Sequence, residues 1–366
     1  MGTHSGAVLR LSDYRELAAG RLPKPVWDYV DGGSGDERTL QHNAAAFDRY
    51  KLRPRVLVDV DKIDTRTTLF GTPLAAPIAL APIAYHRLLH PDGEVATAQG
   101  AGAAGALMVV GIFASRTLED VAAAASGPLW LQLYWLRQRA VLEQLVERAE
   151  AAGYEAFVVT LDTPRVGQRL RDVRNEFSLP EGVAAVNIDP AVMAAAQQTT
   201  GGRPAIAAPA EASFDRTLTW ADLAWLRART RKPILVKGVL TAEDARLAVE
   251  YGVDGIVVSN HGGRQLDNAM APIDVVEEAV RAVRSGGGSI PVLVDGGFRR
   301  GTDVFTALAL GARAVFLGRP FLWGLAVDGA KGVEKVLRMA KAELQHTMTL
   351  MGTSNLAAIE RTAVCP

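Results

Sequence analysis

The chain has 366 residues, of which 49% are hydrophobic, and its 40 basic and 40 acidic side chains cancel. This composition supports a sizeable core and excludes the strongly basic surface that is typical of nucleic-acid binding. A single cysteine, Cys365, excludes an internal disulfide and favours a reducing, cytoplasmic location. The chain also has two long uncharged stretches, but proline or glycine interrupts both of them, so we expect no membrane partner.

The first seventy residues contain three helical patterns, Leu11–Ala19, Val26–Val30 and Glu37–Phe47. They predict an N-terminal helical extension over residues 1–70. We expect a barrel over 71–330 and closing C-terminal helices over 331–366, so that residues 1–366 form a single domain.

Eight short apolar runs follow, each four to six residues long and rich in valine, isoleucine and leucine. Runs without alternation are typical of strands that are buried on both faces of a parallel sheet. The runs are Pro77–Ala81, Ala106–Val110, Leu129–Leu133, Ala156–Leu161, Pro233–Val236, Gly255–Val258, Pro291–Val294 and Ala314–Leu317.

Helical patterns separate these runs. Residues 138–152 place apolar side chains on one face, and Thr241 with Asp244 resembles a helix-capping pair. Strands and helices that alternate in this way over about 250 residues predict an α/β fold, a (β/α)8 TIM barrel. The alternative is a doubly wound sheet, but the Gly-x-Gly-x-x-Gly turn of that fold does not follow the first strand.

Residues 181–217, after the fourth predicted strand, are rich in alanine, threonine, glycine and proline and show little periodicity. A connection of this length inside a compact domain is often a lid. We therefore expect a lid-like loop here, with a tolerated insertion as the alternative.

Catalytic groups of such barrels lie where the strands end. After the sixth run, His261 and Arg264 lie three residues apart on a glycine-broken turn. Histidine can accept a proton near neutral pH, and arginine suits a carboxylate. The pair indicates chemistry on a small carboxylic acid, whereas the alternative is a turn with two surface side chains.

Lys237 ends an apolar strand, where a lysine without a partner would be costly. It therefore implies a partner that is either a carboxylate or the electron-rich part of a cofactor. The alternative is that the side chain reaches solvent.

Glycines and arginines follow the seventh and eighth strands, at Gly296, Gly297, Arg299, Gly318 and Arg319. The loops after these two strands are the common phosphate site of barrels, and backbone N–H groups and guanidinium groups bind phosphate oxygens. The pattern predicts a mononucleotide cofactor.

The six histidines indicate no metal site. His86 and His90 are interpreted as loop residues, because no third ligand is apparent near them.

Five ordered motifs make the chain similar to the FMN-dependent 2-hydroxy acid oxidases and dehydrogenases, a family that includes glycolate oxidase, lactate oxidase, mandelate dehydrogenase and hydroxymandelate oxidase. The resemblance runs from about residue 10 to 360. The motifs are Ser259–Asp267, Gln132–Tyr134, Thr160–Pro164, Leu235–Gly238 and Asp295–Asp303.

The resemblance implies FMN as the cofactor and assigns roles to residues of this chain. His261 would be the base, with Asp162 as its carboxylate partner, and Tyr134 would hydrogen-bond the substrate hydroxyl. Lys237 would lie at the flavin N1–C2=O edge. Tyr29, Arg169 and Arg264 would hold the substrate carboxylate.

The remaining cofactor contacts implied by the resemblance form two groups. The flavin ring would be lined by Pro82, Ile83, Ala84, Gly111, Gln132, Thr160 and Ser259. The ribityl chain and phosphate would be held by Asp295, Gly296, Gly297, Arg299, Gly318 and Arg319.

Departures from the family pattern bear on specificity. Ile83 and Phe113 stand where glycolate oxidase has threonine and tryptophan, and Gly111 replaces a flavin-facing serine or threonine. Phe113, Tyr85 and Val166 would form an apolar pocket wall. Ala84 favours an oxidase, because many dehydrogenase-like members have glycine at this position.

The resemblance is strongest to bacterial hydroxymandelate oxidases. We therefore expect oxidation of an (S)-2-hydroxy acid, of the mandelate or 4-hydroxymandelate type, to the 2-oxo acid, with oxygen reduced to hydrogen peroxide. One alternative acts on aliphatic acids of the lactate or glycolate type with a quinone or another acceptor. Another is an isomerase or a non-catalytic flavin-binding protein. A homotetramer is implied by the family.

Overall fold

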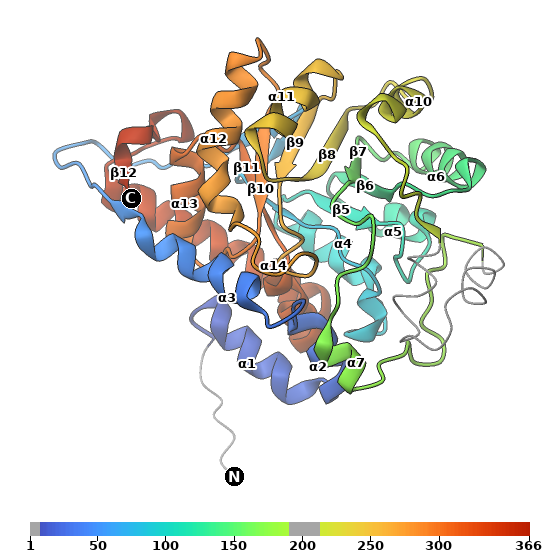
Figure 1. Ribbon diagram of the computed structural model, residues 1–366. Helices are drawn as coiled ribbons and strands as arrows, with labels where there is room; N and C mark the ends of the chain where they lie inside the picture. The colour runs from blue at the N-terminus through green and yellow to red at the C-terminus, as the bar shows by residue number, and fades with distance from the viewer. Residues whose placement is uncertain (1–7, 190–212) are drawn as a thin grey trace.

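The computed structural model of the protein describes residues 8–189 and 213–366 (Figure 1). Residues 190–212, most of the predicted lid-like loop, lie outside the described residues. The described part is organised around a closed barrel of eight parallel strands, which confirms the predicted fold.

All eight predicted runs form barrel strands, and each pairs with the next along the chain until the last pairs with the first. The strands are β4 Ile78–Leu80, β5 Met108–Gly111, β6 Leu129–Tyr134, β7 Phe157–Thr160, β8 Ile234–Val239, β9 Gly255–Val258, β10 Val292–Asp295 and β11 Ala314–Leu317.

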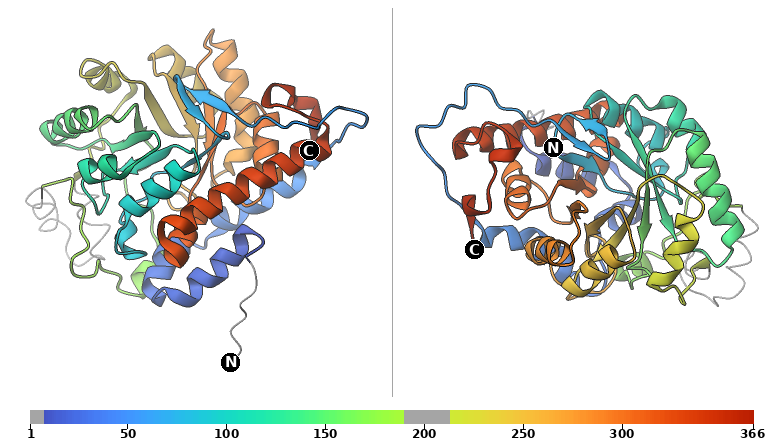
Figure 2. Two further views of the ribbon diagram at one scale, coloured as in Figure 1. Left: turned by 180° about the vertical axis from the view of Figure 1, so that it is seen from behind. Right: turned by 90° about the horizontal axis from the view of Figure 1, so that it is seen from above.

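Helices connect the strands and surround the barrel (Figures 1 and 2). They are α4 Glu94–Ala103, α5 Leu118–Ala124, α6 Arg139–Ala151, α7 Leu170–Arg174, α10 Leu223–Arg227, α11 Ala242–Glu250, α12 Pro272–Ser285, α13 Gly301–Ala309 and α14 Arg319–Met351. Single 3-10 turns occur at η1 Ala46–Arg49, η2 His86–Leu88, η3 Trp220–Asp222, η4 Leu356–Ala358 and η5 Arg361–Ala363.

Two helix predictions are confirmed in detail. The apolar face of α6 is buried through Leu142, Leu145 and Val146. At the start of α11, the Thr241 hydroxyl accepts a hydrogen bond of 3.1 Å from the backbone N–H of Asp244. This contact satisfies one of the N–H groups that have no partner inside the helix.

The barrel interior is filled by side chains that point inward from the strands, such as Trp130, Leu293 and Phe316. Leu69 and Leu74 join this inner cluster from a hairpin of β2 Thr67–Leu69 and β3 Thr72–Leu74. The predicted N-terminal extension is therefore not wholly helical, because β2 and the short strand β1 Lys51–Leu52 lie within it.

Three N-terminal helices, α1 Leu11–Arg21, α2 Lys24–Asp31 and α3 Arg38–Ala45, form where helical patterns were predicted. Figure 2 shows α1 beside the long helix α14. The turn after α2 reaches the barrel mouth, where the N–H of Ser34 donates to the carbonyl of Gly263 at 2.9 Å. The N-terminal segment therefore contributes to the surface at the strand ends.

The chain ends at β12 Val364–Cys365, which pairs with β1 in antiparallel fashion. In 8–189 and 213–366, no helix combines the length and apolar character needed to cross a membrane.

Candidate active site

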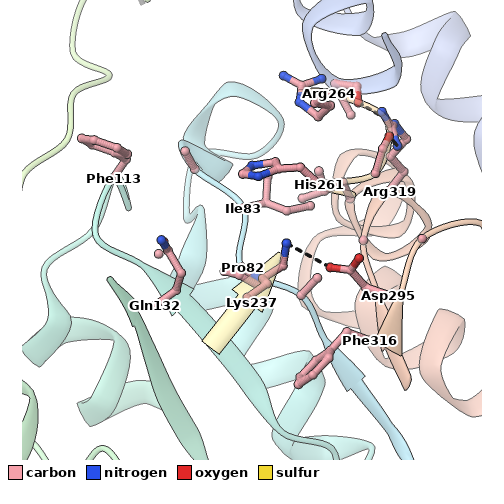
Figure 3. Close-up of a pocket in the computed structure, with 18 of the residues that line it drawn as sticks. Pro82, Ile83, Phe113, Gln132, Lys237, His261, Arg264, Asp295, Phe316 and Arg319 are labelled. Carbon is pink, nitrogen blue, oxygen red and sulfur yellow. Dashed lines mark hydrogen bonds and ion pairs between the residues drawn. The ribbon is translucent and has the colours of Figure 1, made fainter. Parts of the chain in front are cut away.

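One pocket lies at the mouth of the barrel, where the strands end (Figure 3). His261 enters it from the turn after β9, and the backbone there is held at a φ of +59°. Its Nδ1 atom lies 2.8 Å from Oδ1 of Asp162, which follows β7. The Nε2 atom is on the opposite side of the ring, and the Tyr134 hydroxyl lies 3.4 Å from it.

The electrostatic surroundings keep this pair ready to accept a proton. Burial lowers the pKa of His261, and nearby Lys237 lowers it further, although Asp162 acts in the other direction. Burial alone would raise the pKa of Asp162, but its interactions with His261 and Lys237 outweigh burial and lower that pKa. We conclude that Asp162 is ionised and that His261 is neutral at neutral pH.

Arg264, Arg169 and Tyr29 line the same pocket. The Nη1 atom of Arg264 donates to the carbonyls of Tyr29 at 2.7 Å and Gly32 at 2.9 Å, and its guanidinium lies 5.1 Å from the Tyr29 ring centre. Burial, with the charge of Arg169, lowers the pKa of Arg264 to about 9. The Nε of Arg169 is buried and has no partner among the described residues. Two desolvated cations in one pocket suit a carboxylate ligand.

Lys237 points from β8 toward Asp295 at the end of β10 (Figure 3). Its Nζ atom lies 3.2 Å from Oδ2 of Asp295 and donates to the Ser259 hydroxyl at 2.7 Å. Burial alone would lower the pKa of Lys237, but Asp295 and Asp162 outweigh it and raise that pKa. The sequence left two kinds of partner open for Lys237, a carboxylate or the electron-rich part of a cofactor. The structure shows that a carboxylate, that of Asp295, is present. The Oδ1 atom of Asp295 is buried and has no hydrogen-bond partner among the described residues.

The backbone after β10 requires glycine. Gly296 and Gly297 have φ values of +97° and +87°. A Cβ atom on Gly297 would lie 1.9 Å from the carbonyl oxygen of Asn43. This close approach leaves a turn without side chains at one end of the pocket, of the kind that admits a phosphate.

Two arginines lie at the same end. The Arg299 guanidinium lies 5.0 Å from the Trp323 ring centre and donates to the carbonyl of Phe298 at 2.7 Å. Arg319 donates to the carbonyls of Val30, Gly262 and Gly32. Burial lowers the pKa of both arginines to about 10. Because these partly buried cations lie beside a glycine-rich turn, the site fits a phosphate group.

Uncharged residues line the part of the pocket that follows β4, β5 and β6. Pro82, Ile83 and Ala84 line it after β4, and Gly111 and Gln132 line it from β5 and β6. The amide of Gln132 donates to the Thr160 hydroxyl at 3.0 Å. These residues fit the ring system of a flavin, with backbone alone at Gly111.

The pocket brings together most of the residues predicted for the site, from positions as far apart as Tyr29 and Arg319. Asp162, Thr160 and Ser259 lie directly behind its lining, through their contacts with His261, Gln132 and Lys237. Gly318 lines it with space for a ligand, because a Cβ atom there would meet only Ile83, at 3.9 Å.

Some residues at the pocket were not predicted. Phe214 is the most prominent, because its ring stacks on Tyr134 with centres 4.7 Å apart. Thr163, Leu89 and Leu322 also line the pocket. Phe214 falls at the end of the segment without periodicity, so no local sequence signal identified it.

His86, which was interpreted as a loop residue, lies in the connection between β4 and α4, within the single 3-10 turn η2. The side chain is buried in η2, and its Nδ1 atom lies 2.9 Å from the Thr97 hydroxyl. Among the described residues, no group of three or more histidine, cysteine, aspartate or glutamate side chains is arranged to hold a metal ion.

This chain is similar to known proteins along nearly its whole length. Residues 18–366 match the family described as FMN-dependent dehydrogenase. Glycolate oxidase 3 of Arabidopsis thaliana is 47% identical over 357 residues, which cover 98% of this chain and 96% of the relative. Glycolate oxidase 1 of Zea mays is 48% identical over 356 residues, covering 97% and 95%.

A solved structure is also similar. Mandelate oxidase with (S)-4-hydroxymandelic acid superposes with a TM-score of 0.91 and 44% identity, over 97% of this chain and 98% of that one. The pocket, with its glycine turn and partly buried arginines, fits the flavin mononucleotide that the family description names. The extent of these matches shows that the protein belongs to the FMN-dependent dehydrogenase family.

Proposed function

We propose that the protein oxidises an (S)-2-hydroxy acid with an aromatic side chain to the corresponding 2-oxo acid, with oxygen as the electron acceptor and hydrogen peroxide as the second product. The observation that carries this proposal is the pairing of His261 with Asp162 in the pocket that also holds Arg264 and Arg169. Such a reaction requires a base and, in the same pocket, cationic groups that bind the substrate carboxylate.

In this proposal, Arg169 and Arg264, with Tyr29, hold the substrate carboxylate. His261 accepts through Nε2 a proton that the hydroxy acid releases, and the negative charge of Asp162 stabilises the resulting imidazolium. Tyr134 hydrogen-bonds the substrate hydroxyl beside the same nitrogen.

The cofactor would be held along the rest of the pocket. Lys237 would face the ring, and Arg299 and Arg319 with Gly297 would hold the phosphate. FMN, when bound, takes up the two electrons that leave the substrate.

The preference for an aromatic substrate rests on the aromatic wall, which we define as Phe113, Tyr134 and Phe214. The rings of Phe113 and Tyr134 are 5.5 Å apart, and those of Phe113 and Phe214 are 6.2 Å apart. Tyr85 extends the wall, 6.4 Å from Phe113. Aromatic rings favour such surroundings through stacked and edge contacts.

The second candidate substrate is a small aliphatic hydroxy acid. It is favoured by the relatives named glycolate oxidase, which are 47–48% identical to this chain, compared with 44% for the mandelate oxidase structure. Anaerobic reduction of the flavin by glycolate, (S)-lactate, (S)-mandelate and (S)-4-hydroxymandelate separates the candidates. The proposal expects the two aromatic acids to reduce the flavin fastest, and it fails if none of the four bleaches it.

The acceptor is tested separately. Ala84 lines the pocket, and we infer from this position an oxidase in preference to a quinone-dependent dehydrogenase. One peroxide formed for each 2-oxo acid produced in air is the expected result. Turnover that requires an added quinone and yields no peroxide would assign the dehydrogenase alternative.

We also infer a cytoplasmic homotetramer built from single-domain chains, in which residues 1–70 and 331–366 accompany the barrel. This inference rests on the family resemblance and on the chain's single cysteine. Light scattering of the purified protein and fractionation of the source cells test the assembly and the location. One cooperative unfolding transition tests the single domain.

A further inference from the structure

Phe214 belongs to the aromatic wall but does not lie at the end of a barrel strand. It comes from the connection that leads toward β8, and its side chain is only 3% exposed. Its ring lies 4.7 Å from that of Tyr134 and 6.2 Å from that of Phe113, and it lines the pocket. Phe214 is therefore the member of the aromatic wall that the connection before β8 supplies.

Backbone contacts fix Phe214 to the residues directly after β6. Leu136 and Phe214 form an antiparallel bridge, and the N–H of Asp215 donates to the carbonyl of Trp135 at 2.9 Å. The Nε atom of Arg137 donates to the carbonyl of Phe214 at 3.0 Å. The connection is thus joined to the strand that carries Tyr134.

A side-chain clasp strengthens this junction. The Nη2 atom of Arg139 lies 2.7 Å from Oδ2 of Asp215, and its Nη1 atom donates to the carbonyl of Leu136 at 2.5 Å. The same guanidinium lies over the rings of Trp135 and Trp225, at 4.8 and 5.9 Å. A half-buried arginine with partners on two segments holds them in one geometry more firmly than an exposed ion pair would.

We infer that Phe214 determines substrate specificity, because its ring forms the part of the wall that favours an aromatic 2-hydroxy acid over an aliphatic one. Arg139 is a positioning residue that acts through Asp215 and Phe214 and does not line the pocket. This inference rests on the proposed function and deepens it. It assigns the selection between aromatic and aliphatic substrates to a residue that does not lie at a strand end.

The test compares selectivity between two substrates. The ratio of kcat/KM for (S)-mandelate to kcat/KM for (S)-lactate is measured for the FMN-loaded wild type and for Phe214→Ala. We expect the ratio to fall about tenfold, because a ring contact and buried apolar area are lost for mandelate alone. Phe214→Leu keeps apolar volume without a ring, and its ratio should lie between the two.

Arg139→Met tests the clasp. We expect the ratio to fall about threefold in this variant, and to fall no further when Arg139→Met is added to Phe214→Ala, because both changes act on one ring. Arg229→Met is the matched control: Arg229 lies 3.8 Å from the Trp225 ring centre and pairs with Glu143, and Asp215 is not among its contacts in the described part of the chain. Its ratio should equal that of the wild type.

Several results would overturn the inference. One is an unchanged ratio in Phe214→Ala, and another is an equal loss for both substrates, which would mean that Phe214 only supports Tyr134. If Phe214→Ala fails to fold, the kcat/KM ratios of Phe214→Leu and Arg139→Met test the inference. Ratios equal to that of the wild type in both variants would reject the inference. Failure of the proposed function looks different, because then the wild type itself oxidises neither acid.

Discussion

The Nδ1 atom of His261 lies 2.8 Å from Oδ1 of Asp162, although the two residues are 99 positions apart in the chain. The contact joins the turns after β9 and β7 and directs the other ring nitrogen of His261 toward Tyr134. It makes the imidazole a base with a fixed orientation and a charge partner.

His261→Ala should retain FMN and lose nearly all flavin reduction by substrate. The cofactor contacts of the pocket remain, whereas a positioned base is worth about 10²–10⁴ in rate. Anaerobic stopped-flow absorbance measures the reduction, and the visible spectrum of the isolated protein reports bound flavin. Reduction at the wild-type rate would remove His261 from the role of base.

Asp162→Asn should slow reduction by about 10- to 100-fold, because a hydrogen bond to a charged group contributes about 1.5–3 kcal/mol. Burial already lowers the pKa of His261, and the negative charge of Asp162 opposes that shift. Removing the charge lowers the pKa further. Since the base must be neutral, the acid limb of the profile of kcat/KM against pH should move to lower pH. The plateau of the same profile should fall. A limb that moves to higher pH would contradict this assignment.

Lys237→Met should destabilise the protein as well as slow reduction. It leaves the carboxylate of Asp295 buried without the cation that lies 3.2 Å away, and breaking a buried pair in this way costs about 3–5 kcal/mol. Thermal unfolding measures the loss. The control is Lys237→Met combined with Asp295→Asn, which removes both charges and should recover part of the melting temperature. No recovery would mean that the ion pair does not explain the loss.

Arg299→Met should weaken FMN binding without affecting riboflavin, which lacks the phosphate. The Arg299 guanidinium is partly buried at the phosphate end, and loss of solvent contact lowers its pKa to about 10. Loss of a charge-assisted hydrogen bond worth about 1.5–3 kcal/mol should raise the Kd for FMN about 10- to 100-fold. Fluorescence titration of the apoprotein with both flavins measures this. Equal weakening for both would place Arg299 away from the phosphate.

Gly297→Ala and Gly153→Ala form a matched pair, because both glycines have a φ of +87°. A Cβ atom on Gly297 would lie 1.9 Å from the Asn43 carbonyl oxygen, whereas one on Gly153 would meet nothing within 4 Å. Gly153→Ala should cost only the backbone strain, about 1–3 kcal/mol. Gly297→Ala should cost more than about 4 kcal/mol or prevent folding. Similar melting temperatures for the two variants would rule out the close approach at Gly297.

Several site features depended on partners that are distant in the sequence. The apolar strand before Lys237 predicted that the lysine needs a partner, but only the closed barrel brings Asp295 beside it. Likewise, no periodicity marked Phe214, because its position depends on a bridge to Leu136 and not on local hydrophobic pattern. The hairpin that supplies Leu69 and Leu74 to the inner core was not predicted, since its strands are short and contain Pro73.

The sequence by itself determined the eight strands, their order and the positions of the chemical groups at their ends. A strand buried on both faces leaves an uninterrupted apolar run that can be read locally, and glycines with positive φ mark the turns that follow. Only the tertiary structure decided which of these groups meet. Closing the barrel brings His261 to Asp162, and the connection before β8 brings Phe214 to Tyr134, because packing between distant segments follows from the whole fold.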